Sequence, residues 1–183
     1  MSRARPLPKT RVRRHDRGMK PRSPAPRKPD PIDRANLRPE FWRRFPLDEL
    51  PRHEWEALCD GCGKCCLLKL EDEDTNEVAY TSVACRLLDL GTCRCGNYPL
   101  RRQLVPGCVV IDRDSLERII DWMPLTCAYR LIHDGHDLYD WHPLISGDPD
   151  SVHRAGISML GRMTAEYDVD EDDLEDYIIE DQC

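Results

Sequence analysis

Four closely spaced cysteines constrain this chain more than any other feature of its sequence. They form the pattern Cys-x2-Cys-x2-Cys-Cys, with the members Cys59, Cys62, Cys65 and Cys66. Sulfur atoms bound at about 2.3 Å to one tetrahedral ion lie about 3.8 Å apart, and a tight turn across two residues can produce that separation. Gly61 and Gly63 give the backbone the freedom for such a turn. The pattern therefore predicts that Cys59, Cys62 and Cys65 bind one metal centre.

Five further cysteines follow in the same region, so another ligand can come from outside this run. Cys93 and Cys95 are the pair expected to close the site. Cys85, Cys108 and Cys127 are additional candidates, either as ligands or as small buried hydrophobic residues. The sequence thus makes all nine of these cysteines candidate metal ligands.

Cys65 and Cys66 form a special case because they are adjacent. Neighbouring side chains in an extended segment point to opposite sides, so the two thiols are not expected to bind the same ion. Either one of them packs in the core or the chain holds two metals. Several thiolates around one divalent ion leave a net negative charge. The basic residues close enough in sequence to offset it are Lys64, Lys69, Arg86 and Arg94.

The cysteine count also bears on the compartment. Ten cysteines in 183 residues is a high number for a reducing compartment, where clustered cysteines more often bind metal than form disulfides. No apolar stretch follows the basic start, so we expect a cytoplasmic protein without a secretory signal. No apolar run exceeds four residues, so we expect no membrane helix. Cys183, behind the acidic end of the chain, is expected to be an exposed bystander.

Charge is segregated along the chain. Residues 1–38 contain 13 Lys and Arg against three Asp, and they hold seven of the 15 prolines. Such a segment cannot build a core, so residues 1–37 are expected to form a disordered basic arm. The arm has no aromatic side chain to stack on bases, which disfavours nucleic-acid binding as its role. Residues 164–183 contain ten Asp and Glu and no Lys or Arg, and they are expected to form an acidic tail.

Residues 38–163 are expected to form a small, irregular, cysteine-rich α+β domain. The predicted elements are a helix over 47–58, a hairpin over 67–83, a helix that begins at Ser115 as N-cap and stops at Pro124, and a helix over 152–164. The whole chain contains only two Phe, so its core is thin. In such domains a bound metal often contributes folding free energy.

Six segments carry a resemblance to a known family, and they occur in the same order. They are residues 59–66, 83–86, 93–98, 106–108, 124–130 and 141–144. The chain resembles the YcgN/YkgJ-type CxxCxxCC family over about residues 38–160. The family is described as zinc- or iron-chelating, so the resemblance implies metal binding. A related cysteine motif in flagellin lysine N-methylase implies an iron-sulfur cluster as the alternative to zinc, and cysteine spacing does not separate the two.

Three functions are compatible with this sequence. The first is a metal-binding or carrier protein, the second an iron-sulfur-dependent redox or group-transfer enzyme, and the third an adaptor with a structural metal. Each of them implies a protein or small-molecule partner whose identity the sequence leaves open. His133 and His136 have ligand-like spacing but flank an Asp-Gly turn, which disfavours ligation. His142 is expected to be a packed, hydrogen-bonded side chain rather than a base.

Overall fold

The structure, a computed structural model, describes residues 32–179. Most of the predicted basic arm lies outside this range, and so does Cys183. The described residues form short helices, two small sheets and much irregular chain, which confirms the predicted α+β class. No helix within residues 32–179 is long and apolar enough to cross a membrane.

Three short helices open the described chain: α1 (Phe41–Arg44), η1 (Leu47–Glu49) and α2 (Arg52–Ala57). The sequence predicts one helix over 47–58, but the structure divides it at Pro51. A proline disfavours helical backbone at the residue before it. Leu50 is accordingly extended, with φ −72° and ψ 128°. Pro51 then precedes the first turn of α2, and the chain reaches Cys59 directly behind that helix.

The later helices are also short. They are η2 (Lys64–Cys66), η3 (Tyr98–Leu100), α3 (Arg101–Leu104), α4 (Arg113–Ile119), η4 (Ile120–Trp122), α5 (Ala128–His133), α6 (Pro143–Ser146), α7 (Ser151–Arg154), η5 (Glu166–Asp168) and η6 (Glu171–Tyr177). Helices of this length are not stable alone, so their positions depend on tertiary packing.

Two helix boundaries differ from the sequence prediction. Asp112 rather than Ser115 is the N-cap of α4. The Asp112 carboxylate accepts the Ser115 N–H at 2.8 Å, and the Ser115 hydroxyl accepts the Asp112 N–H at 3.0 Å, which makes a capping box. The helix predicted over 152–164 ends at Arg154, because Gly156 adopts a left-handed conformation with φ 72°.

The predicted hairpin over 67–83 is confirmed. Strand β1 (Leu67–Glu71) pairs antiparallel with β2 (Val78–Ala84), and β5 (Thr164–Ala165) joins the other edge of β2 in parallel. A second sheet consists of β3 (Leu88–Asp89) and β4 (Arg94–Cys95). The acidic segment behind β5 continues along β2, where the Ile179 N–H donates to the Tyr80 carbonyl at 2.8 Å. The described part of this acidic segment therefore lies against the sheet.

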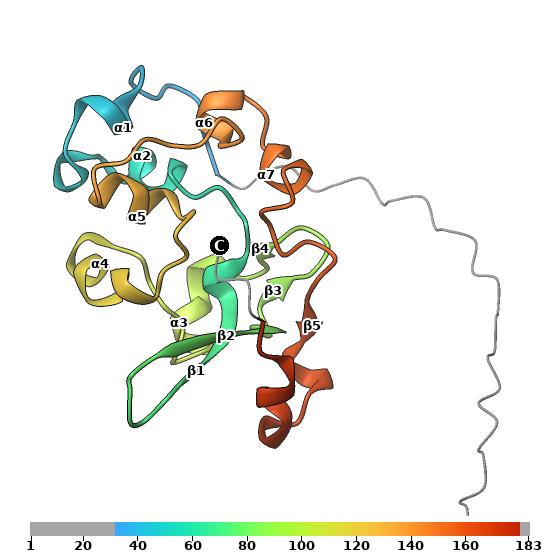
Figure 1. The fold of residues 1–183 in the computed structure, drawn as a ribbon. Helices are drawn as coiled ribbons and strands as arrows, with labels where there is room; N and C mark the ends of the chain where they lie inside the picture. The colour runs from blue at the N-terminus through green and yellow to red at the C-terminus, as the bar shows by residue number, and fades with distance from the viewer. Residues whose placement is uncertain (1–31, 180–183) are drawn as a thin grey trace, which may run out of the picture.

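Two hydrophobic clusters form the interior. The helical core consists of Phe41, Leu50, Trp55, Ala57, Leu58, Leu116, Ile120, Met123, Ala128, Tyr129 and Leu138. The sheet core consists of Leu67, Tyr80, Ala84, Leu88 and Met159. Figure 1 shows the helices α1, α2, α4 and α5 above the hairpin of β1 and β2, with the chain from α2 to β1 running between them. Ile32 and Leu37, within the segment predicted as the arm, pack against the helical core.

An aromatic pair joins α2 to α5. The Trp55 and Tyr129 rings lie 5.1 Å apart between centroids. The Tyr129 hydroxyl donates to the Trp55 carbonyl at 2.9 Å, and the Trp55 indole N–H donates to the Ile111 carbonyl at 3.0 Å. Since Cys59 follows α2 and Cys127 precedes α5, this pair fixes the relative position of two predicted ligands.

A buried carboxylate ties the start of the described chain to α2. Glu54 is fully buried, and its carboxylate accepts hydrogen bonds from the Arg38 guanidinium at 2.6, 2.9 and 3.1 Å. The Arg38 backbone N–H also donates to Glu54, at 3.0 Å. The guanidinium stacks on the Phe45 ring at 3.5 Å from its centroid. The hydrogen bonds from Arg38 lower the pKa of Glu54, and burial opposes this shift.

We expect the ion pair of Arg38 and Glu54 to make the free energy of unfolding depend on pH in the acidic range. Because the pKa of Glu54 is lowered in the folded state, its contribution is present above the unfolded value of about 4.3 and is lost as pH falls through the folded value. The wild type should therefore have a higher unfolding free energy than Glu54→Gln at pH 6. This difference should become smaller at low pH. Urea denaturation at a series of pH values measures this difference, and a constant difference would contradict the assignment.

Candidate metal centre

The cysteine run lies in a loop with a special backbone. Gly61 and Gly63 adopt left-handed conformations, with φ 79° and 82°. The guanidinium of Arg94 also lies against Gly61, where a Cβ would be 2.2 Å from its Cζ atom. Behind Gly63 the chain enters the 3₁₀ turn η2, which contains Cys65 and Cys66. The two glycines thus allow the tight turns that the spacing predicts.

Three distant segments hold the backbone of this loop. Arg34 donates from Nη2 to the Cys59 carbonyl at 2.6 Å, and the Met159 N–H donates to the Cys62 carbonyl at 2.8 Å. His142 donates from Nε2 to the Leu58 carbonyl at 3.0 Å. These bonds satisfy carbonyl groups that a buried loop would otherwise leave unpaired. The cysteine run is therefore fixed by residues far from it in sequence.

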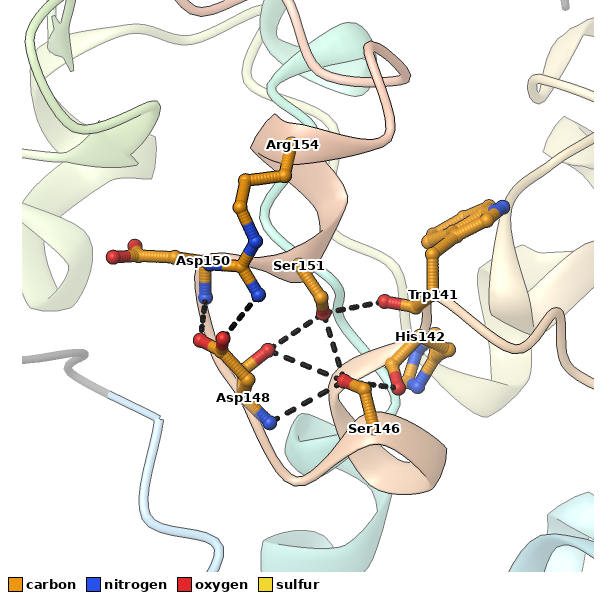
Figure 2. Close-up of polar contacts among 7 residues, drawn as sticks. All are labelled: Trp141, His142, Ser146, Asp148, Asp150, Ser151 and Arg154. Carbon is orange, nitrogen blue, oxygen red and sulfur yellow. Dashed lines mark hydrogen bonds and ion pairs between the residues drawn. The ribbon is translucent and has the colours of Figure 1, made fainter.

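His142 is a structural residue, as the sequence analysis expects. Its Nδ1 atom accepts the Leu144 N–H at 3.1 Å, so both ring nitrogens are engaged and Nε2 carries the proton. Burial lowers the pKa of His142, which keeps the ring neutral. Figure 2 shows the network beneath it, in which the Ser146 hydroxyl donates to the His142 carbonyl at 3.1 Å and contacts the Ser151 hydroxyl at 2.8 Å. This network holds the ring in place to bind the loop.

The nine predicted ligands all lie among the described residues, and none forms a disulfide. Cys59 and Cys62 lie in the loop behind α2, and Cys65 and Cys66 lie in the 3₁₀ turn η2. Cys85 follows β2, and Cys93 and Cys95 lie in the turn before β4 and in β4 itself. Cys108 lies in the turn after α3, and Cys127 lies at the N-terminus of α5. Elements between residues 59 and 127 thus contribute thiols.

The adjacent pair does not follow the expectation for an extended chain. The Sγ atoms of Cys65 and Cys66 lie 3.9 Å apart, so the two thiols share one side of the backbone. The prediction that they point apart is wrong because they lie in a 3₁₀ turn rather than a strand. A hydrogen bond from the Cys66 thiol lowers the pKa of Cys65 to about 7, and the charge of Lys69 adds to this effect.

Cys62, Cys65 and Cys127 act on one another electrostatically. Burial raises the pKa of Cys62 well above its ordinary value, and the charges of Cys65 and Cys127 add to it. Burial likewise raises the pKa of Cys127, with a further contribution from Cys65. Cys59 has its pKa raised to about 12, by burial first and then by neighbouring charges that include Cys65. Cys127, a reserve candidate from sequence, is thus within electrostatic range of Cys62 and Cys65.

Of the other cysteines, Cys93 and Cys85 contact the loop, whereas the contact of Cys108 is local. Cys93 lies against Gly63, where a Cβ would be 3.4 Å from its Sγ atom, so it contacts the loop directly. Cys85 is joined to the loop through its N–H, which donates to the Cys66 carbonyl at 2.9 Å. Cys108 bonds locally, with its thiol 3.7 Å from the Val109 carbonyl.

Lys69 and Arg94, two of the predicted cations, act on the thiols, and Lys64 is buried in η2 beside Cys65. The Lys69 ammonium donates to the Cys65 and Leu67 carbonyls at 3.0 and 2.8 Å, beneath the rings of Tyr80 and Trp122. Burial lowers the pKa of Lys69, while neighbouring thiolates raise it. Arg94 acts on Cys59 and Cys93 in the direction that favours thiolate.

The other cation and histidine predictions have different outcomes. Arg86 forms an ion pair with Glu166, with 3.2 Å between Nη2 and Oε1. His133 contacts the Asp134 carboxylate at 2.9 Å through Nδ1 and lies at the surface with His136. These contacts favour the prediction that neither histidine is a ligand.

The donor set fits a zinc or iron centre. Thiolates bind both metals, and zinc also accepts carboxylate oxygen. One acceptor in the loop is left over: the Oδ2 atom of Asp60 is buried without a hydrogen-bond partner among the described residues. Within residues 32–179, no three His, Cys, Asp or Glu side chains are already arranged to hold an ion. Binding a metal therefore requires side-chain rotation, as is usual where binding is linked to folding.

The lowered pKa of Cys65 makes a testable prediction for metal-free, reduced protein. Only the thiolate is alkylated. Iodoacetamide should therefore modify Cys65 with a pH midpoint near its pKa of about 7. Cys66→Ala removes the hydrogen bond and should move the midpoint toward the value of about 8.5 of an ordinary thiol. Peptide mass spectrometry at a series of pH values measures both, and an unchanged midpoint would contradict the role of Cys66.

Comparison with known proteins agrees with the cysteine pattern. Residues 58–128 match the CxxCxxCC family, described as "Putative zinc- or iron-chelating domain". A UPF0260 protein of Rhodobacter capsulatus is 58% identical over 147 residues, which cover 80% of this chain and 98% of that relative. A UPF0260 protein of Cellvibrio japonicus is 60% identical over 139 residues, or 76% and 94% of the two chains. No solved structure matches the chain. At this identity and coverage, the chain belongs to the UPF0260 family and carries the CxxCxxCC domain.

Proposed function

We propose that this protein binds a zinc ion or an iron centre through its clustered cysteines. The single observation that carries the proposal is the gathering of reduced cysteines at one loop: the Sγ atoms of Cys65 and Cys66 lie 3.9 Å apart, Cys62 is buried beside them in the chain, and Cys93 lies against Gly63. Reduced thiols buried beside each other are an oxidisable liability unless they hold a metal. The match to a domain described as zinc- or iron-chelating supports the same proposal.

The chain's own residues would have distinct tasks in such a centre. Cys62, Cys65 and Cys127 would supply thiolate sulfur, and Cys59, within the loop, and Cys93, which contacts Gly63, could join them. Bound metal would supply a positive charge that keeps these thiols deprotonated. Lys69 and Arg94 would offset the negative charge that remains. Such chemistry requires a reducing compartment, which is why we place the protein in the cytoplasm.

The proposal predicts that protein purified without oxygen contains bound metal. Elemental analysis should find zinc or iron, and acid-labile sulfide would identify an iron-sulfur cluster. Cys62→Ser should lose metal and lower the melting temperature together, because metal binding is linked to folding. Cys183→Ser is the matched control and should change neither property, since Cys183 lies far from the cysteine run in sequence.

Two results would contradict the proposal. One is the absence of zinc and iron above the level found in Cys62→Ser. The other is a Cys62→Ser protein with full metal content. Cys95→Ser separates the remaining candidates: loss of metal would make Cys95 a ligand, whereas retained metal with a loss of about 1 kcal/mol of stability would make it a packing residue.

A further inference from the structure

One buried acidic residue stands inside the cysteine run. Asp60 lies between Cys59 and Cys62, and only 4% of its surface is exposed. Its Oδ1 atom accepts the Cys62 N–H at 2.8 Å, which fixes the turn. Its Oδ2 atom has no hydrogen-bond partner among residues 32–179. The loop therefore accounts for the burial of Oδ1 but not for that of Oδ2.

A lone carboxylate oxygen in the interior is costly, and protonation does not remove the cost. An ionised carboxylate loses its hydration on burial and needs a compensating charge or donors. A proton on Oδ2 would become a donor that in turn needs an acceptor, and Oδ2 has no partner of either kind within the described part of the chain. A cation bound to Oδ2 satisfies the atom directly.

The charge of Asp60 acts on thiols of the cysteine run and on two more distant in the sequence. Burial is the main cause of the raised pKa values of Cys62 and Cys127, and the charge of Asp60 is the next cause in both. The same charge also acts on Cys59, Cys65 and Cys93. Without a cation, the carboxylate and the thiolates repel each other. A divalent ion among them would attract each of these groups and outweigh their mutual repulsion.

We propose that Asp60 is itself a metal ligand through Oδ2, so that the centre combines thiolate sulfur with one carboxylate oxygen. This inference rests on the proposed function and makes it more specific. An oxygen donor favours zinc or ferrous iron over softer ions such as cadmium, which prefer sulfur. Asp60 would thus determine which metal the cysteines select.

Asp60→Asn tests this role with little disturbance of the loop. The asparagine side chain keeps an oxygen to accept the Cys62 N–H, but it replaces Oδ2 with an amide NH₂ that cannot bind a metal. Asp72→Asn is the matched control. The Asp72 carboxylate caps the exposed hairpin turn through the Asp74 and Thr75 N–H groups, at 3.0 and 2.8 Å.

The experiment measures zinc and cadmium affinities of the full, reduced chain by competition with a chromophoric chelator. We expect Asp60→Asn to weaken zinc binding at least about tenfold and cadmium binding clearly less, whereas Asp72→Asn leaves both unchanged. Unchanged zinc affinity in Asp60→Asn would overturn the inference. An equal loss for both metals would also overturn it, because a nearby charge that is not a ligand weakens both alike.

A second measurement keeps the test decisive if Asp60→Asn does not fold. Zinc X-ray absorption of the wild type should show an oxygen at about 2.0 Å beside sulfur at about 2.3 Å, and an all-sulfur sphere would overturn the inference. The proposed function fails separately, if the wild type binds neither zinc nor iron. If the wild type and Asp60→Asn bind zinc equally tightly, only the role of Asp60 is rejected.

Discussion

Hydrogen bonds to the backbone of one loop determine where the thiols lie. Three successive parts of the loop, at Leu58, Cys59 and Cys62, present carbonyl groups to donors from distant segments. Cysteine side chains are short, so their sulfur atoms follow the backbone closely. If the loop were free, the thiols would be spread over many arrangements, and binding a metal would carry the entropy cost of ordering them. Folding meets the backbone part of this cost, and the side chains of the described residues still have to rotate to bind a metal.

The two hydrophobic clusters hold the segments that donate these hydrogen bonds to the loop. The helical core joins α2 to α5 through Trp55 and Tyr129, and this contact brings the segment before α5 to the loop. The sheet core holds Met159, whose N–H bonds to the loop from the other side. The chain from α2 to β1 runs between the helices and the hairpin, as Figure 1 shows. Metal bound there would join the two clusters and stabilise both.

The sequence predicts the local features of this site and misses the distant ones. The cysteine spacing and the two glycines predict the tight turns, and two apolar segments separated by an acidic turn predict the hairpin. The sequence does not predict the hydrogen bond from Arg34 to the loop, because Arg34 lies in a segment that is predicted to be a solvated arm. Met159 acts through its backbone N–H, which no side-chain pattern reveals. Asp60 was visible between the first two cysteines, but its burial depends on the tertiary structure.

Convergence of distant thiols on the cysteine run is the central claim, and metal-protected alkylation tests it most directly. The reduced full chain is treated with a thiol reagent with and without zinc, and each modified cysteine is identified by mass spectrometry. The account predicts that zinc protects Cys62, Cys65 and Cys127 together and leaves Cys183, far from the cysteine run in sequence, reactive. Protection confined to residues 59–66, or no protection at all, would contradict it.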